Sequence, residues 1–305
     1  MHAAFQTFLN PVLPVFAILG LGMLFARRGV FDAPAAAILN RFVFYVGVPA
    51  LLFSLLSKVD IQAFELRVLL LYFVSELLVY AAGATLARTV FRRGWRESLL
   101  LGMTASFVNH VFFVLPMARV LYGEGATAAI VGIITIDSGL IFSAHVIGLE
   151  LADRGVASTR KLARQLLGHP LLLAIGAGLA VNLLGLPLHV GIFTFVGFTG
   201  AAAAPVALFA LGVILWSTGE RRGDPMALAV AGLKVVVHPL LAWGVFSAVA
   251  VDNPAWTAPA LLVAAGPCGA MPFVLALQYR VPVASIARAI VYSTLASLLT
   301  LSLMG

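Results

Sequence analysis

Several ionisable side chains of this 305-residue chain lie inside apolar stretches that are long enough to cross a bilayer. Glu76, Asp137 and Lys234 each lie about 8–11 residues into such a stretch, which places them near its midpoint at the 1.5 Å rise of a helix. A charge there costs about 2.5–3.5 kcal/mol on insertion scales, so these groups should face the protein interior and one another. Lys234 and His238 are four residues apart and share a helix face. Glu76 and Asp137 are therefore candidate carriers of a proton or cation, and Lys234 is either a substrate counter-ion or half of a structural pair with Glu76.

The composition identifies the environment that these groups must tolerate. The chain is 62% hydrophobic and only 10% charged, whereas soluble domains carry roughly 25% charged residues. Its net charge of +7 comes from short basic runs between apolar stretches, which is typical of cytoplasmic loops and not of a nucleic-acid-binding surface. Cys268 is the single cysteine, so an intrachain disulfide or a multi-cysteine metal site is excluded, and we expect no cofactor.

Ten apolar stretches predict ten transmembrane helices in an all-α membrane protein. Their ranges are 5–26, 36–57, 67–90, 98–121, 126–150, 168–186, 193–216, 227–250, 258–278 and 283–303. Most Lys and Arg residues fall in the inward loops if the N-terminus is outside, so the positive-inside rule places both termini on the periplasmic side.

Prolines recur at an offset of 156 residues, which predicts an internal repeat. The pairs are Pro14 and Pro170, Pro49 and Pro205, and Pro116 and Pro272. We therefore expect a first five-helix repeat at 1–151, a cytoplasmic linker at 152–167 and a second five-helix repeat at 168–305. Because five is odd, the halves would sit in the membrane in opposite orientations, the 5+5 inverted repeat that recurs in secondary transporters.

The fourth and ninth stretches each contain helix-breaking residues at corresponding places. Proline removes a backbone donor and clashes with the carbonyl four residues earlier, so both helices should be broken and cross each other. Interrupted helices at matching places point to a transport site, and the half-helix ends beyond Pro116 and Pro272 would attract an anion. The predicted substrate-binding residues are Asn109, His110, Pro116, Gly269, Pro272, Lys234 and His238.

The order of these motifs along the chain resembles the auxin efflux carrier family, whose bacterial members include malonate and malate permease-like proteins. The resemblance rests on Pro11 and Pro14, Gly47-Val48-Pro49-Ala50-Leu51, Asn109 with Pro116, Tyr122-Gly123, and the Pro272 region. It implies a bacterial inner-membrane protein in which helices 1, 2, 6 and 7 form a scaffold and helices 3–5 and 8–10 move. It also implies that Asn109 and the turns at Pro116 and Pro272 line the substrate site. The sequence departs from the family at His110, Phe112 and Phe113, where small residues are usual.

The favoured function is secondary transport of a mono- or dicarboxylate, such as malonate or malate, by an elevator-like mechanism driven by protons or the membrane potential. A sodium-coupled symporter of the bile-acid type is the alternative, with oxygens from Ser106, Asn109, Thr135 and Ser138. An intramembrane enzyme is less favoured, because Asp137 is the lone aspartate within a predicted span. The expected partners are the anion, a proton or sodium ion, and lipid; Gly- and Ala-rich helix faces would also allow a homodimer.

Overall fold

The computed structural model describes residues 2–59, 61–123, 127–154, 167–217 and 223–302, and within them the chain is helical apart from loops and one isolated β-bridge. The helices of the first half are α1 (His2–Arg27), α2 (Ala33–Phe42), η1 (Val43–Gly47), α3 (Val48–Leu56), η2 (Ile61–Ala63), α4 (Leu66–Thr89), α5 (Trp95–Ser106), η3 (His110–Val114), α6 (Leu115–Tyr122), α7 (Thr127–Ile136), η5 (Asp137–Ile141) and α8 (Phe142–Arg154). Those of the second half are α10 (Pro170–Leu183), α11 (Val190–Ala201), α12 (Ala203–Ser217), α13 (Pro225–Gly232), η6 (Leu233–Val237), α14 (His238–Ala248), α15 (Pro254–Ala265), α16 (Met271–Gln278) and α17 (Ala284–Ser302). Most of the predicted linker at 152–167 lies outside the described residues.

Five helices of the described chain are long and apolar enough to cross a membrane. They are Ala33–Leu56, Leu66–Thr89, Ala128–Leu151, Val190–Ser217 and Pro225–Ala248. Three further apolar helices are shorter: Phe16–Arg27, Pro170–Leu183 and Pro254–Ala265. The all-helical, membrane-spanning character of the chain agrees with the sequence, while the count of ten spans stays a prediction.

The described residues contain four π-helical turns, and three of these turns end two residues before a proline. The turn η1 precedes Pro49, η3 precedes Pro116, and η6 precedes Pro239. A proline ring clashes with the carbonyl four residues back, and a wider turn moves that carbonyl aside. The fourth turn, η5, begins at Asp137, with no proline after it.

The predicted interruptions of the fourth and ninth stretches are confirmed, but the first lies earlier than the sequence indicates. The helical backbone stops after Ser106, resumes at His110 and runs through Pro116. The sequence predicts a half-helix that begins near Pro116. The π-turn explains the difference, because it accommodates the proline without ending the helix. In the ninth stretch the backbone is non-helical at 266–270, as its glycines and Pro267 predict.

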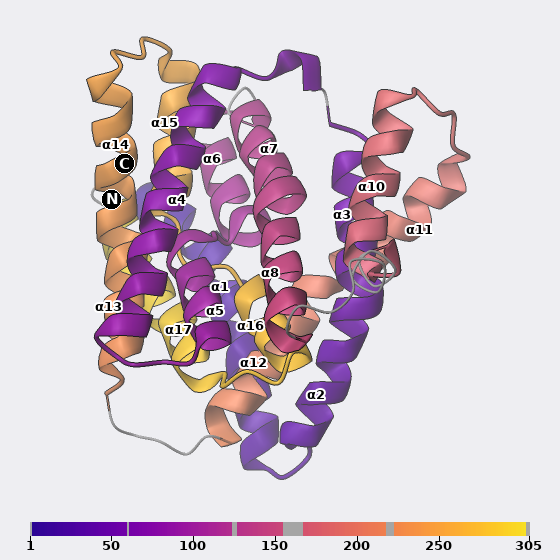
Figure 1. Cartoon of the computed structure of the whole chain (residues 1–305), viewed down its shortest axis with the longest axis vertical. Helices are drawn as coiled ribbons and strands as arrows, with labels where there is room; N and C mark the ends of the chain where they lie inside the picture. The colour runs from indigo at the N-terminus through magenta and orange to yellow at the C-terminus, as the bar shows by residue number, and fades with distance from the viewer. Residues whose placement is uncertain (1, 60, 124–126, 155–166, 218–222, 303–305) are drawn as a thin grey trace.

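One group of helices consists of α1, α2, α3, α10, α11 and α12, and we call it the scaffold group. Within it α1 packs on α12, while α3 packs on α10 and α11. Gly22 and Gly212 let α1 and α12 approach closely, because an added Cβ at either would collide with a carbonyl of the other helix. Figure 1 shows α2, α3, α10 and α11 together along one side of the molecule.

The second group, here the crossing group, consists of α4–α8 and α13–α17 together with η3, η5 and η6. In it α4 packs on α5 and α14, α13 packs on α17, and α15 packs on α7 and α14. In Figure 1, α4, α13 and α14 lie along the side opposite α10 and α11.

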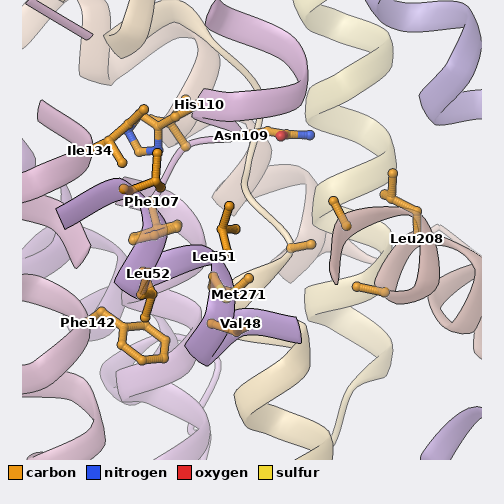
Figure 2. Close-up of a pocket in the computed structure, with 15 residues that line it drawn as sticks. Val48, Leu51, Leu52, Phe107, Asn109, His110, Ile134, Phe142, Leu208 and Met271 are labelled. Atoms are coloured by element: carbon orange, nitrogen blue, oxygen red, sulfur yellow. The ribbon is translucent and has the colours of Figure 1, made fainter. Parts of the chain in front are cut away.

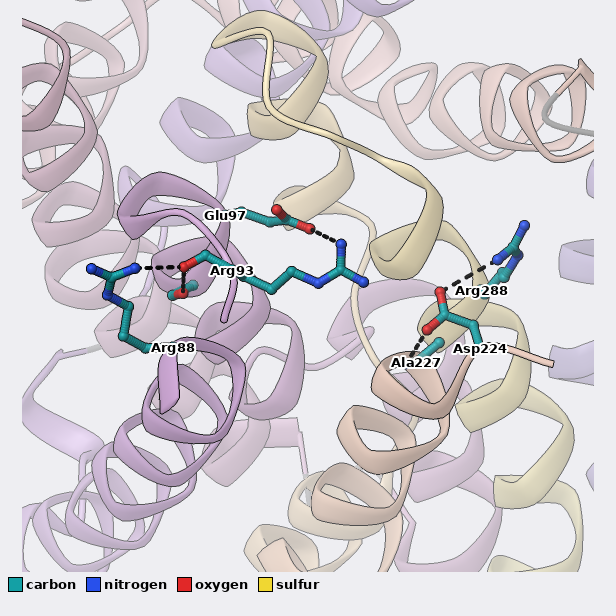
Figure 3. Close-up of polar contacts among 7 residues, drawn as sticks. Arg88, Arg93, Glu97, Asp224, Ala227 and Arg288 are labelled. Atoms are coloured by element: carbon teal, nitrogen blue, oxygen red, sulfur yellow. Dashed lines mark hydrogen bonds and ion pairs between the residues drawn. The ribbon is translucent and has the colours of Figure 1, made fainter. Parts of the chain in front are cut away.

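Charged side chains fix helix ends within the crossing group. Asp224 caps α13 by accepting from the Ala227 amide at 3.1 Å, and its other oxygen lies 3.4 Å from Arg288 of α17 (Figure 3). Figure 3 also shows Arg93 paired with Glu97 at the start of α5, at 3.4 Å. Partial burial raises the pKa of the Glu97 carboxyl above its ordinary value, and the Arg93 guanidinium opposes that rise.

Candidate functional site

The two helix interruptions meet in the interior and bond to each other. Val108 and Cys268 form an antiparallel β-bridge, in which the Asn109 amide donates to the Pro267 carbonyl at 3.0 Å and the Gly269 amide donates to the Phe107 carbonyl at 2.9 Å. Backbone groups freed by a broken helix must find partners inside a bilayer. Each interruption therefore supplies the partners that the other one needs.

Glycines make this close crossing of backbones possible. A Cβ at Gly269 would lie 2.7 Å from the Val108 carbonyl oxygen, and a Cβ at Gly266 would lie 2.6 Å from a methyl group of Val114. Neither position has room for a side chain. The role of Gly269 that the geometry shows is close packing at the crossing.

A cavity of about 80 Å³ opens beside the crossing, between the two groups of helices. Its walls are mostly apolar and come from four places. These are α3, the two crossing segments (107–109 and 266–270) with the helical turns that follow them, the α7–α8 helix, and α12. The lining residues are Val48, Leu51, Leu52, Leu55, Phe107, Val108, Asn109, His110, Ile134, Phe142, Ala204, Ala207, Leu208, Ala270 and Met271. Among them Asn109 and His110 carry the polar side chains. In Figure 2 the His110 ring lies beside Phe107 and Ile134, whereas the Asn109 amide points away from them.

Three wall residues from α3 have counterparts in α12 at the same offset as the paired prolines. Val48, Leu51 and Leu52 lie 156 residues before Ala204, Ala207 and Leu208. Corresponding segments of the two halves of the chain thus face each other across one cavity.

Behind the cavity wall lies a set of buried ionisable side chains. His110 Nε2 lies 2.8 Å from Asp137 Oδ2, and these side chains are 5% and 1% exposed. Glu76 of α4 is fully buried and close enough to Asp137 and Lys234 for their charges to interact. His110 thus connects the cavity to carboxyl groups that solvent does not reach.

Lys234 and His238 lie at the end of this set of ionisable groups that is farther from the cavity, and they do not line the cavity. Lys234 Nζ is 2.8 Å from His238 Nδ1 and donates to the Ala264 carbonyl at 2.7 Å. Both side chains are fully buried. The His238 ring also contacts Tyr72, with centroids 5.5 Å apart.

The predicted site residues therefore fall into three sets. Asn109 and His110 line the cavity; Glu76, Asp137, Lys234 and His238 lie behind it; Gly269 packs at the crossing. Pro272 is buried in the first turn of α16. Pro116 lies in α6, and its side chain is outside the described residues.

Of the four proposed sodium ligands, the structure describes three side chains, and Ser138 is outside that set. Thr135 donates within α7 to the Val131 carbonyl at 2.7 Å. Ser106 is buried, with no hydrogen-bond partner for its hydroxyl in the described part of the chain. No group of three or more His, Cys, Asp or Glu residues in that part could hold a metal ion.

Sequence reasoning missed two contributions to the site. The Ser293 hydroxyl accepts a hydrogen bond from the Cys268 amide at 3.0 Å and so fixes the second crossing segment, while Asp137 contacts His110 directly after the first. Ser293 lies 156 residues after Asp137, so the proline offset could have identified it. The α3 and α12 walls could have been found in the same way.

Comparison with known proteins gives the family. The family model described as "Membrane transport protein" matches residues 7–151 and 143–305, almost the whole chain. The chain belongs to this membrane transport protein family, the auxin efflux carrier family that its motifs resemble. It is therefore a multi-pass membrane protein of a transporter family.

Similar members of the family come from bacteria, archaea and plants. The "Putative malonate transporter" of Rhizobium meliloti (strain 1021) is 28% identical over 302 residues, which cover 95% of this chain and 92% of the relative. An "Uncharacterized transporter" of Methanothermobacter thermautotrophicus is 27% identical over 295 residues, which cover 96% of this chain and 95% of that relative. The "Probable auxin efflux carrier component 5c" of Oryza sativa subsp. japonica is 28% identical over 145 residues, 45% of this chain and 39% of that protein.

Proposed function

We propose that this membrane transporter moves a small organic anion, a mono- or dicarboxylate such as malonate or malate, by an elevator-like change of access. The observation that carries the proposal is the cavity beside the two crossed helix interruptions, with Asn109 and His110 at its polar end. Binding sites of secondary transporters are typically formed by such discontinuous helices. The rhizobial relative named for malonate transport supports the choice of substrate class.

The chemistry of the cavity suits a carboxylate. Helix segments that begin at the crossing present free amides and the positive end of a helix dipole, which favour an anion. The Asn109 amide offers donors, and His110 offers a ring nitrogen that is a donor when protonated. The small volume and apolar walls favour a short-chain acid over a large lipid-like anion.

The chain would span the membrane ten times as two inverted five-helix repeats, 1–151 and 168–305, joined by the cytoplasmic linker at 152–167. Support comes from the wall residues of α3 and α12, and from Asp137 and Ser293, which all share the offset of the paired prolines. Both termini would then face the periplasm, across the inner membrane of a bacterium.

The moving unit would be the crossing group, carried past the scaffold group. The cavity lies between the two groups, so relative movement would expose it to one side of the membrane and then the other. The scaffold group also carries strongly exposed aromatic side chains, including Phe195 and Phe198 on α11, a face that suits lipid or a second copy in a homodimer.

Proton coupling would run through His110, Asp137 and Glu76. Two buried carboxyl groups that lie close together cannot both hold a negative charge without a large cost in free energy. One of them would therefore carry a proton, and this proton would be the coupling ion. The contact between His110 and Asp137 would link this proton to the substrate cavity.

Sodium coupling remains the second candidate function, because Ser106 is a buried hydroxyl without a described partner beside the crossing. Uptake that is unchanged when choline replaces sodium would eliminate it. Catalysis is not proposed, because the described residues that line the cavity include no nucleophile beside a base.

The direct test is uptake of short mono- and dicarboxylates by proteoliposomes, with and without imposed proton and sodium gradients. We expect the wild-type protein to accumulate malonate or malate. Asn109→Ala should weaken substrate affinity by about tenfold or more, as expected for loss of a hydrogen bond to a charged group. Asn109→Asp, which adds a negative charge at equal size, should weaken it further.

The matched control is Pro14→Ala, which changes an exposed residue of α1 away from the cavity and should leave uptake unchanged. Equal activity of Asn109→Ala, Pro272→Ala and Pro14→Ala would reject the assignment of the crossing as the substrate site.

A further inference from the structure

The end of α15 lies in the protein interior, where its last carbonyl groups need partners. A helix leaves its last four carbonyls without helical partners and carries a partial negative charge at that end. Gly266 satisfies the Val263 carbonyl at 3.0 Å. The Ala264 carbonyl is satisfied by the ammonium group of Lys234.

Lys234 is built into this position by several contacts. Its Nζ donates to Ala264 at 2.7 Å and lies 2.8 Å from His238 Nδ1, and the side chain is fully buried. The carboxyl groups of Glu76 and Asp137 are close enough to interact electrostatically with it. The ammonium is therefore held by the end of α15 and by a histidine of α14, with carboxyl groups of α4 and η5 near enough to interact with its charge.

Transporters with interrupted helices use the same kind of place for a coupling ion. The C-terminal ends of half-helices and unwound carbonyls there coordinate sodium or a proton. In this chain a side chain of the protein already occupies such an end and contributes up to three donors.

We propose that Lys234 is a built-in cation, a positioning residue that holds the end of α15 at the crossing where an exchangeable metal cation would otherwise bind. This inference rests on the proposed transport function and deepens it, since it makes transport independent of sodium. It also separates Lys234 from direct substrate contact, in keeping with its absence from the cavity wall.

The position in the first half of the chain that corresponds to Lys234 carries no basic residue. Leu78 lies 156 residues before Lys234 and is an exposed apolar residue of α4. The end of α5 therefore receives no lysine from the corresponding position.

Cys268 provides a readout that does not depend on transport. It is fully buried in the second crossing segment and is the single cysteine of the chain, so its rate of labelling by N-ethylmaleimide reports opening of the crossing. The experiment compares purified wild type, Lys234→Ala, and Lys58→Ala, a lysine that lies over the Phe193 ring away from the crossing.

We expect Lys234→Ala to label at Cys268 about tenfold faster or more than wild type, because a hydrogen bond to a charged group is lost. Methylammonium should return the labelling toward the wild-type rate by filling the vacated place, and Lys58→Ala should label as wild type does. Lys234→Met, which keeps most of the side-chain volume, should label fast without rescue by methylammonium. It serves as the test if Lys234→Ala cannot be purified.

Slow labelling of both Lys234 variants would overturn the proposal. So would wild-type uptake, or wild-type protection of Cys268, that requires sodium. A wild-type protein that moves no carboxylate would instead reject the proposed function, while the labelling experiment would still decide the role of Lys234.

Discussion

The two crossing segments interrupt the fourth and ninth apolar stretches and differ in their chemistry. The first, 107–109, leads into a π-turn that carries His110, and its Asn109 side chain is partly exposed to the cavity. The second, 266–270, is built from small residues, and its Cys268 is fully buried. The first segment therefore supplies the polar groups for recognition, and the second supplies the close approach that brings them into place.

The neighbours of the two segments differ in the same way. Next to the first, His110 contacts Asp137, one of the buried ionisable groups, whereas the second contacts Ser293, a neutral hydroxyl that lies 156 residues after Asp137. In the proposed mechanism, proton coupling is therefore concentrated on the first half of the chain and structural support on the second.

The largest effect should come from filling the close approach. Gly269→Ala places a Cβ 2.7 Å from the Val108 carbonyl oxygen, so backbone must move. We expect a loss of about 3 kcal/mol of stability, the upper range for overpacking a core, measured by thermal unfolding of the purified protein.

Gly197→Ala is the matched control, because nothing lies within 4 Å of a Cβ at that position in α11. It should leave stability unchanged or raise it by up to about 1 kcal/mol, through the helix preference of alanine over glycine. Equal stability of the two variants would show that the crossing is not closely packed.

A smaller effect should follow from removing the acid beside the first segment. Asp137→Asn keeps the shape but removes the charge that faces His110, so proton-driven uptake should fall at least about tenfold, equivalent to about 1.4 kcal/mol. Uptake driven by a proton gradient in proteoliposomes measures it. Unchanged uptake and pH dependence would remove Asp137 from the coupling path.

The smallest effect should come from the corresponding residue of the second half. Ser293→Ala leaves the buried Cys268 amide without its acceptor, at a cost of about 1 kcal/mol in stability. Because Ser293 carries no charge, we expect the pH dependence of uptake to stay as in wild type. A shifted pH profile in this variant would break the division of roles between the halves.

The interruption of the ninth stretch could be predicted because its cause is local. Gly266, Pro267 and Gly269 alter the backbone at their own positions, and Pro272 lies 156 residues after Pro116. The exact place of the first break could not be predicted, since a π-turn at His110–Val114 lets the helix continue through Pro116.

The buried site was only partly predictable for a different reason. Burial cost alone indicated that Glu76, Asp137 and Lys234 would face inward, and all three are buried. The partner of Lys234 is a backbone carbonyl of Ala264, and every residue has a carbonyl, so no residue type in the sequence marks it. The apolar cavity walls likewise look like any membrane helix until the two halves are aligned.

The most direct test of the central claim is the accessibility of Met271, which lines the cavity and lies at the start of α16. In a Cys268→Ser background, Met271→Cys would be labelled in proteoliposomes by a membrane-impermeant maleimide added to one side or the other. A carboxylate site that changes its access predicts labelling from both sides and slower labelling in the presence of malonate or malate. Labelling from one side only, at a rate that no short carboxylate alters, would contradict it.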